Sequence, residues 1–183
     1  MEYSNETGYP SVTDILSPWV DTQWFKPIHA KRGDAIHGAV KLDLQGMFVP
    51  SLPPAWQIYV DSYYPFKKHI VEIIGIEERL ISQEEGYCGQ YDLLARMDER
   101  FHNAIALLDW KSSQAKYSWW KPQLGGYANL IIKKKGISPD IAISARLRKD
   151  PGKKILIDVY DKNDIQHFMH WFNAARVCHQ NFK

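Results

Sequence analysis

Asp109 and Lys111 place two opposite charges at the end of an apolar run. The run, Ala104 to Leu108, is typical of a strand that is buried on both faces. Because successive side chains of a strand point to opposite faces, Asp109 and Lys111 share one face and Trp110 takes the other. A carboxylate and an ammonium at the rim of a buried strand form either an ion pair or a reaction site. The tripeptide alone leaves both interpretations open.

A second carboxylate, Asp92, lies within the preceding predicted strand, "CGQYDLLARM", and converges with Asp109 if the two strands are neighbours. Magnesium prefers oxygen ligands and is usually held by one or two carboxylates together with water and phosphate oxygens. Lys111 can then face the attacking water or a phosphate oxygen, where its charge opposes the negative charge that develops during phosphodiester cleavage. The three residues therefore predict a metal-dependent phosphoryl-cleaving centre.

The composition narrows the class of protein. The 183 residues, of which 45% are hydrophobic, suit one well-filled domain. The net charge of +2 gives no indication of whether the protein binds nucleic acid. An anionic partner would have to be bound by a local basic patch. Cys88 and Cys178 are too few for a four-thiolate zinc or iron–sulfur site and favour a reducing, intracellular setting. With no apolar run of ~20 residues and no signal peptide, we expect a soluble, unprocessed protein with no membrane partner.

Five segments have the apolar spacing or the end signals of helices. They cover residues 11–16, 35–46, 53–66 and 118–133, and the stretch that follows the capping residue Asp161. Five other segments read as strands, at 69–82, 88–97, 103–111, 140–147 and 153–160. The first three are joined by short turns and predict an antiparallel meander. The order of the elements predicts an α/β fold with a central mixed β-sheet flanked by helices.

The motif "GYCGQYDLLARM" followed by "ALLDWKSSQ" resembles the core of the PD-(D/E)xK nuclease superfamily, and of its RecB-like exonuclease branch in particular. Three flanking motifs, "GDAIHGAVKLDLQG", "GIEERL" and "PQLGGYANL", resemble the histidine helix, the glutamate strand and the Gln-x-x-x-Tyr helix of that branch. The stretch "YPSVTDIL" also looks like the opening of phage and mitochondrial genome-maintenance exonucleases. One departure is Tyr91, where the superfamily name has proline.

The resemblance implies a restriction-endonuclease-like core, with residues 1–183 as a single nuclease domain. It implies a Mg²⁺- or Mn²⁺-dependent deoxyribonuclease with one or two ions and no iron–sulfur cluster, located in the cytoplasm, or in the host cytoplasm if the protein is viral. The expected function is exonuclease action on single-stranded DNA or DNA ends, in phage-type recombination, replication or repair. A structure-specific endonuclease with the same centre and a non-catalytic DNA-binding relative remain alternatives.

The resemblance also implies roles for individual residues. Asp92, Asp109 and Lys111 are the expected catalytic residues. The expected metal ligands are His37, Glu77, Asp92, Asp109 and the carbonyl of Trp110; the neighbouring Glu78 remains an alternative to Glu77. The expected substrate-binding residues are Ser112, Ser113, Lys116, Trp119, Gln123 and Tyr127. Gln123 and Tyr127 lie four apart on a helix, so they share a face and can contact DNA or brace the metal site.

Overall fold

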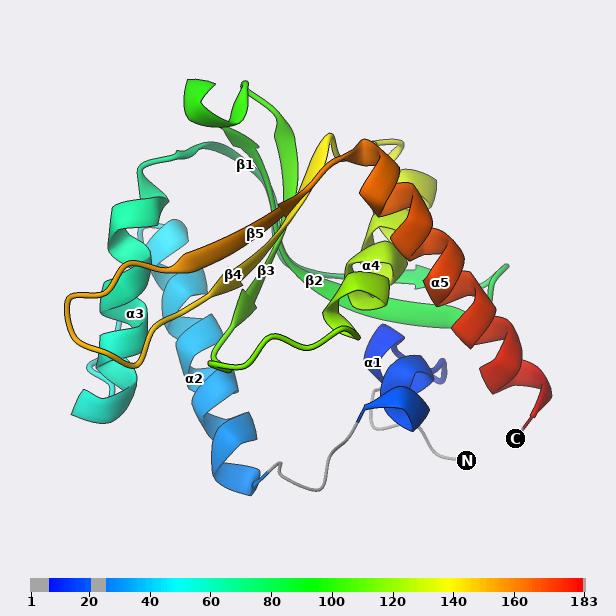
Figure 1. Ribbon diagram of the computed structural model, residues 1–183, viewed down its shortest axis with the longest axis horizontal. Coiled ribbons are helices and arrows are strands. Elements are labelled where there is room, and N and C mark those ends of the chain that lie inside the picture. The colour runs from blue at the N-terminus through cyan, green and yellow to red at the C-terminus, as the bar shows by residue number, and fades with distance from the viewer. Residues whose placement is uncertain (1–6, 21–25, 183) are drawn as a thin grey trace.

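A five-stranded mixed sheet runs through the middle of the molecule (Figure 1). The computed structural model describes residues 7–20 and 26–182. The strands stand side by side in sequence order, and only β3 and β4 are parallel. This arrangement confirms the predicted central mixed sheet and its antiparallel meander. The strands are β1 (Ile70–Ser82), β2 (Tyr87–Met97), β3 (Ile105–Lys111), β4 (Ile141–Arg146) and β5 (Leu156–Tyr160).

Helices cover both faces of the sheet, as the order of the elements predicts (Figure 1). One face packs against α2 (Pro27–Leu44) and α3 (Pro54–Lys67). The other packs against α1 (Val12–Leu16), α4 (Trp120–Lys135) and α5 (Lys162–Asn181). Short 3₁₀ turns occupy Ser17–Trp19 and Glu99–Phe101. Within the described ranges, no helix is both long and apolar enough to span a membrane.

The parallel pair at the centre of the sheet fixes where the charged end of β3 lies. A parallel connection needs a crossover, and α4 supplies it between β3 and β4. Asp109 pairs in register with Ser144, and Lys111 pairs with Arg146. The carboxyl ends of both strands therefore reach the same edge of the sheet, next to the start of α4.

The first long helix differs from its prediction. The apolar repeat predicted a start at residue 35, whereas α2 begins about two turns earlier, at Pro27. Proline is well suited to the first position of a helix, because its missing N–H would have had no partner there. Gly33 and Asp34, which were expected to precede the helix, lie inside it. The added turns place residues 27–33 on the same helix as His37.

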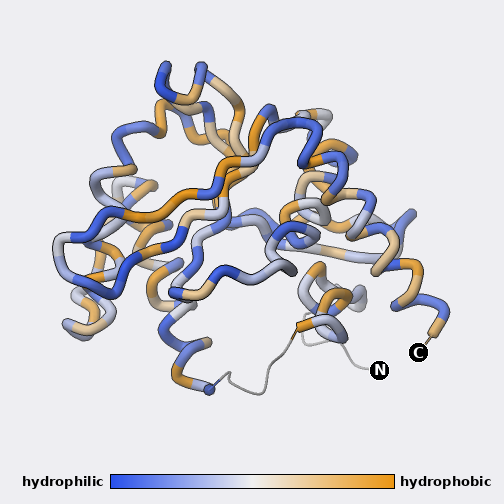
Figure 2. The backbone as a smooth tube through the Cα atoms, viewed as in Figure 1, coloured by the Kyte–Doolittle hydropathy of each residue, from blue (hydrophilic) through white to orange (hydrophobic). Residues whose placement is uncertain are grey.

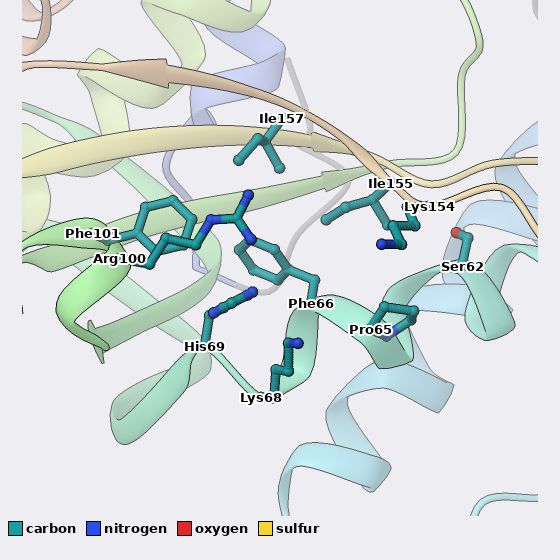
Figure 3. A pocket seen from close by; sticks show the side chains of 10 residues that line it. All are labelled: Ser62, Pro65, Phe66, Lys68, His69, Arg100, Phe101, Lys154, Ile155 and Ile157. Atoms are coloured by element: carbon teal, nitrogen blue, oxygen red, sulfur yellow. The ribbon is translucent and has the colours of Figure 1, made fainter.

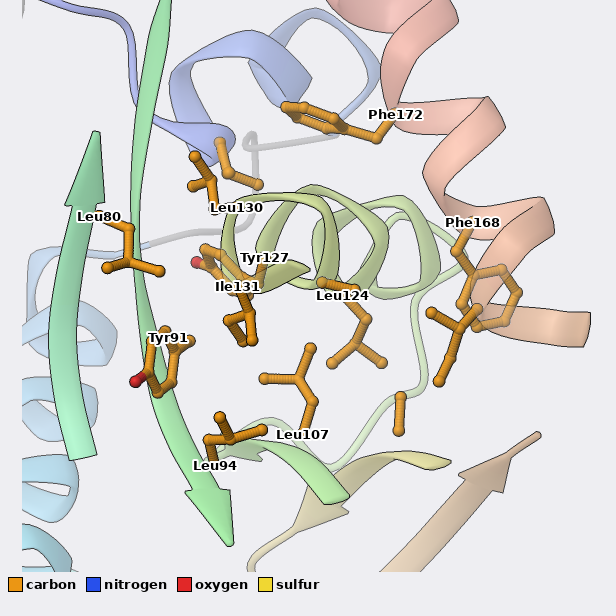
Figure 4. Packing of buried hydrophobic residues seen from close by; sticks show 14 of the residues in the cluster. Leu80, Tyr91, Leu94, Leu107, Leu124, Tyr127, Leu130, Ile131, Phe168 and Phe172 are labelled. Carbon is orange, nitrogen blue, oxygen red and sulfur yellow. The ribbon is translucent and has the colours of Figure 1, made fainter. Parts of the chain in front are cut away.

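A hydrophobic cluster fills the space between the sheet and α4 (Figure 4). Leu94 and Leu107 project from the strands toward Leu124 and Ile131 of the helix, and all four are buried. Figure 2 shows hydrophobic stretches where the strands lie between the helix layers and hydrophilic turns at the helix ends. Burial of this apolar surface, worth about 25 cal/mol per Å², holds the helices in place.

The crossing of α4 and α5 requires a residue without a side chain. A Cβ atom on Gly125 would lie 2.2 Å from the carbonyl carbon of Phe168 in α5. The two helix backbones are therefore too close to admit even a methyl group. This close packing holds α4, which carries the expected Gln123 and Tyr127, firmly against the sheet.

Candidate metal centre

Three side chains from three different elements meet at one end of the sheet. His37 of α2, Glu77 of β1 and Asp92 of β2 each offer a ligand atom, and these atoms all lie within 4.8 Å of one another. The Nδ1 atom of His37 lies 3.4 Å from Asp92 Oδ1 and 3.7 Å from Glu77 Oε1. The structure thus brings together three of the five residues that the resemblance assigns to a metal.

The backbone of Glu77 adopts an unusual conformation at this point. Its φ is +47°, in the left-handed region that residues with a side chain rarely enter. The neighbouring pairs Ile76–Leu93 and Glu78–Tyr91 place Glu77 opposite Asp92. Gln90 fixes the Glu77 carboxylate by donating from Nε2 to Oε2 at 2.6 Å. Backbone strain of this kind costs about 1–3 kcal/mol and concentrates at functional sites.

The adjacent Glu78 takes a structural role away from the cluster. Its Oε2 accepts a hydrogen bond from the Tyr91 hydroxyl at 2.5 Å and pairs with Lys135 of α4 at 2.6 Å. The hydrogen bond from Lys135 lowers the pKa of Glu78. Of the two adjacent glutamates, Glu77 is therefore the one that lies beside His37 and Asp92.

The backbone of β3 connects this cluster to the second carboxylate. The Trp110 N–H donates to Asp92 Oδ2 at 2.6 Å. The Trp110 ring points to the other side of the sheet, where its centroid lies 5.5 Å from that of Tyr63. Asp109, only 3% exposed, forms an ion pair with Lys111. The carboxylate of Asp109 thus lies outside the three-residue group, one residue from the backbone that binds Asp92.

Gln123 of α4 contacts the Lys111 ammonium, and Tyr127 of the same helix contacts Gln123. Lys111 Nζ donates to Gln123 Oε1 at 2.6 Å, and Gln123 Nε2 donates to the Tyr127 hydroxyl at 3.1 Å. The rings of Trp119 and Trp120 each have their centroid 5.3 Å from the same Nζ atom. Gln123 and Tyr127 are both buried, and their hydrogen bonds link them to Lys111 and to each other.

The pKa values show an excess of negative charge in this cluster. Burial raises the pKa of Asp109 to about 6, and the charge of Asp92 adds to the rise while Lys111 opposes it. Burial alone would lower the pKa of His37, but the charge of Asp92 and bonds to Asp92 and Glu77 raise it well above its usual value. For Asp92, the desolvation that raises the pKa is outweighed by His37, so the pKa is lowered. The pKa shifts of His37 and Asp92 thus reflect the attraction between the imidazole and the carboxylate beside it.

The donor set fits a divalent cation. Carboxylate oxygens suit Mg²⁺ and Mn²⁺, and an imidazole nitrogen is acceptable to Mn²⁺. The cluster is only partly covered, since the His37 side chain is 27% exposed, so a metal and a substrate oxygen have access. Gln90, bonded to Glu77, orients a ligand from outside, as partners of metal ligands commonly do.

Three adjoining hollows lead away from the cluster. The first, of about 450 Å³, is lined by His37 and Glu77 and stays open at Gly38, which has no atom within 4 Å of its Cβ position. The second, which we call the basic hollow, measures about 870 Å³ and shares Ala30 and Asp34 with the first. The basic hollow is lined in part by Lys26, His29, Arg32, Ser112, Ser113, Trp119 and Lys149.

The third hollow is an aromatic groove of about 520 Å³, and Trp119 lines both it and the basic hollow. Trp19 and Trp171 also line the groove, and each is about half exposed.

The expected substrate residues outside α4 divide into two groups. Ser112, Ser113 and Trp119 lie along the hollows, whereas Lys116 is absent from their walls and pairs with Asp158 at 2.6 Å.

Arg32 is a residue of the site that the sequence did not suggest. Its guanidinium donates to the carbonyl of Ser112 at 3.4 Å and lies 5.2 Å from the centroid of the Tyr59 ring. The prediction of a helix from residue 35 left Arg32 in a loop. The Pro27 that begins α2 was the available signal, because it extends the helix through Arg32.

Comparisons with known proteins find a similar fold and no similar sequence family. The sequence matches no protein-family model and no curated protein. The fold is similar to the crystal structure of a "Putative exonuclease" from Eubacterium rectale, with a TM-score of 0.53 and 14% identity, over 93% of this chain and 73% of that one. A structure called SSO0001 aligns over 89% of this chain and 83% of its own, at 13% identity, but its TM-score of 0.35 is too low to inform the fold. This chain therefore shares its α/β fold with the Eubacterium rectale structure.

Proposed function

We propose that this protein is a Mg²⁺- or Mn²⁺-dependent deoxyribonuclease of the RecB-like exonuclease branch of the PD-(D/E)xK superfamily. The observation that carries the proposal is the meeting of His37, Glu77 and Asp92 beside the Asp109–Lys111 pair. A protein that only binds DNA gains nothing from buried carboxylates next to phosphates, whose charge they repel. The similarity of the fold to the structure called a "Putative exonuclease" supports the same function.

His37, Glu77, Asp92 and Asp109, with the carbonyl of Trp110, would hold one or two ions. When bound, such an ion polarises the phosphate and activates water as a nucleophile. Lys111 then has a single catalytic role, which is electrostatic. Its ammonium, oriented by Asp109 and by Gln123 Oε1, stabilises the negative charge that grows on the phosphate oxygens.

The hollows supply a path for the DNA strand. The basic hollow carries Lys26, Arg32 and Lys149, whose charges attract phosphates without regard to sequence. Ser112 and Ser113 follow Lys111 directly and can donate hydroxyl hydrogens to a phosphate. Trp119, at the junction with the aromatic groove, can stack an unpaired base. These features favour a single strand or a frayed DNA end as substrate.

The decisive experiment follows an end-labelled oligonucleotide with the purified wild type and with Lys111→Ala. We expect hydrolysis by the wild type in Mg²⁺ or Mn²⁺, none in EDTA, and none by Lys111→Ala, which should keep its fold and much of its DNA affinity. Lys134→Ala, an exposed lysine of α4, is the matched control and should remain active. Undiminished hydrolysis by Lys111→Ala, or an inactive wild type in both metals, would contradict the proposal.

The exonuclease part is tested separately with closed circular and linear single strands. An enzyme that needs an end leaves circles intact and shortens linear strands. Cleavage of the circles would replace the exonuclease assignment by that of an endonuclease with the same centre.

A further inference from the structure

A fourth hollow, none of whose lining residues belongs to the metal cluster, lies between the end of α3, the turn from β2 to β3 and the edge strand β5 (Figure 3). We call it the α3–β5 hollow. Its volume is about 180 Å³, which is smaller than the ~300 Å³ at which sites for drug-sized ligands begin. It therefore suits one compact chemical group rather than a large molecule.

Three cationic side chains from three separate segments surround the hollow. Lys68 follows α3, Arg100 lies in the β2–β3 turn, and Lys154 precedes β5 (Figure 3). All three residues are exposed, and none forms an ion pair with another residue of 7–20 or 26–182. Lys67, Arg96 and Arg148, each close to one of them in sequence, do have carboxylate partners. The carboxylate close to these cations is that of Asp98, which accepts the Arg100 backbone N–H at 3.2 Å and lowers the local positive charge in part. Among the residues of 7–20 and 26–182, the cations of the hollow thus outnumber the anions beside it.

A histidine in the same hollow is held in a fixed orientation. His69 Nδ1 lies 2.7 Å from Asp98 Oδ2, and no hydrogen bond to Nε2 is formed within the described part of the chain. The Asp98 carboxylate accepts the Nδ1–H and fixes the ring, which leaves Nε2 available to a ligand. The rings of Phe66 and Phe101 pack edge-on against it at 5.9 Å and 5.7 Å between centroids.

The floor of the hollow is apolar. Phe66 and Phe101 are 6% and 9% exposed, and Ile155 and Ile157 complete the lining. An anion bound above this floor is shielded from water on one side, which strengthens its attraction to the three cations. An organic group attached to the anion would rest on the aromatic and aliphatic side chains.

We propose that the α3–β5 hollow binds a phosphomonoester, with the phosphate among Lys68, His69, Arg100 and Lys154 and the attached sugar on the apolar floor. A carboxylate needs one cationic partner, whereas a phosphomonoester has a charge between −1.5 and −2 and three acceptor oxygens. The number and spread of the cations therefore match the phosphate. A free mononucleotide and the 5′-phosphate of a DNA strand both carry this group.

The site is independent of the proposed nuclease activity, because its residues are distinct from those of the metal cluster. Phe66, which lines the hollow, also packs against Trp110 of β3, with 6.0 Å between the ring centroids. Binding can thus be measured in EDTA, where no hydrolysis occurs, and in the Lys111→Ala variant.

The test is calorimetric titration in EDTA with dTMP, thymidine, inorganic phosphate and an oligothymidylate with or without a 5′-phosphate. We expect saturable binding of dTMP or of the phosphorylated oligonucleotide, and none of thymidine. The double variant Arg100→Gln/Lys154→Gln should weaken this binding roughly tenfold or more, because two charge-assisted contacts are lost. Lys134→Gln should bind as the wild type does.

Tighter binding of dTMP identifies the free nucleotide as the source of the phosphate, and tighter binding of the phosphorylated strand identifies the DNA end. Both outcomes support the site. Equal binding of thymidine and dTMP, an affinity unchanged in the double variant, or no saturable binding of either phosphorylated probe would overturn it. Circular dichroism of the double variant, whose replaced residues are both exposed, checks that the fold is kept.

Discussion

The Trp110 N–H donates to Asp92 Oδ2, and this bond stands where the ladder between β2 and β3 ends. The last residues paired between the two strands are Leu93 and Leu108. Beyond this pair, the Asp92 carboxylate accepts the hydrogen bond from the Trp110 N–H in place of a backbone carbonyl. The side-chain bond thus joins the two strands beyond their last paired residues and satisfies a buried N–H.

Asp92→Asn should abolish the response of the protein to Mn²⁺. A metal at 100 times its Kd adds about 2.7 kcal/mol to the free energy of unfolding, so the wild-type Tm should rise by about 5–10 °C. The asparagine can still accept the Trp110 N–H, but it lacks the charge that binds the ion. Thermal unfolding with and without Mn²⁺ measures the difference.

Glu78→Gln is the matched control for that experiment, because Glu78 lies one residue from Glu77 and binds Lys135 instead of facing His37. It should keep the full Mn²⁺ response. A response lost in Glu78→Gln and retained in Asp92→Asn would place the metal elsewhere.

Mn²⁺ affinity should rise with pH through the region around pH 6. The pKa of Asp109 is raised to about 6 and that of His37 is raised well above its usual value, so both groups hold protons at low pH. A metal must displace these protons, and the apparent affinity therefore falls by up to about tenfold per proton and per pH unit below the pKa values. Titration calorimetry between pH 5 and 8, at roughly unit steps, measures the slope.

Asp109→Asn removes one of the two titrating groups and should flatten this pH dependence. An affinity that is independent of pH in the wild type would contradict the assignment of these residues as ligands.

Gln123→Leu should slow hydrolysis while leaving metal binding intact. The leucine fills a similar buried volume but cannot accept the hydrogen bond of Lys111, a charge-assisted bond worth about 1.5–3 kcal/mol. We expect kcat to fall roughly ten- to a hundredfold with KM and the Mn²⁺-induced Tm rise unchanged. Tyr127→Phe, which removes only the hydroxyl that contacts Gln123, should have a smaller effect. A KM effect without a kcat effect would show that Gln123 binds substrate instead.

Gly125→Ala should destabilise the protein by about 1–3 kcal/mol or more, because the added methyl group forces the backbones of α4 and α5 apart. Gly38→Ala is the control, since both glycines lie inside helices but the space beside Gly38 is open. That substitution should stabilise the fold by up to about 1 kcal/mol through the better helix propensity of alanine. Chemical denaturation measures both changes, and equal effects of the two substitutions would show that the crossing is not tightly packed.

Much of the site was predictable because it depends on local patterns. The alternation along β3 placed Asp109 with Lys111 and turned Trp110 away, as the contacts of all three side chains confirm. The motif order brought His37 into the same cluster as Asp92. Arg32 was missed, since an apolar repeat is weak in the first turns of α2, where one face of the helix borders an open hollow rather than the core.

By itself, the sequence predicted most of the strands and helices, the mixed sheet and three residues that the structure brings together, because these follow from periodicity, turn residues and side-chain chemistry. The tertiary structure decided which of two adjacent glutamates faces the histidine, that Lys116 forms an ion pair with Asp158, and that Lys68, Arg100 and Lys154 gather around one hollow beside β5. The reason is physical: these relationships join residues that are far apart in the chain. Only the packing of the helices on the two faces of the sheet fixes the distances between their side chains.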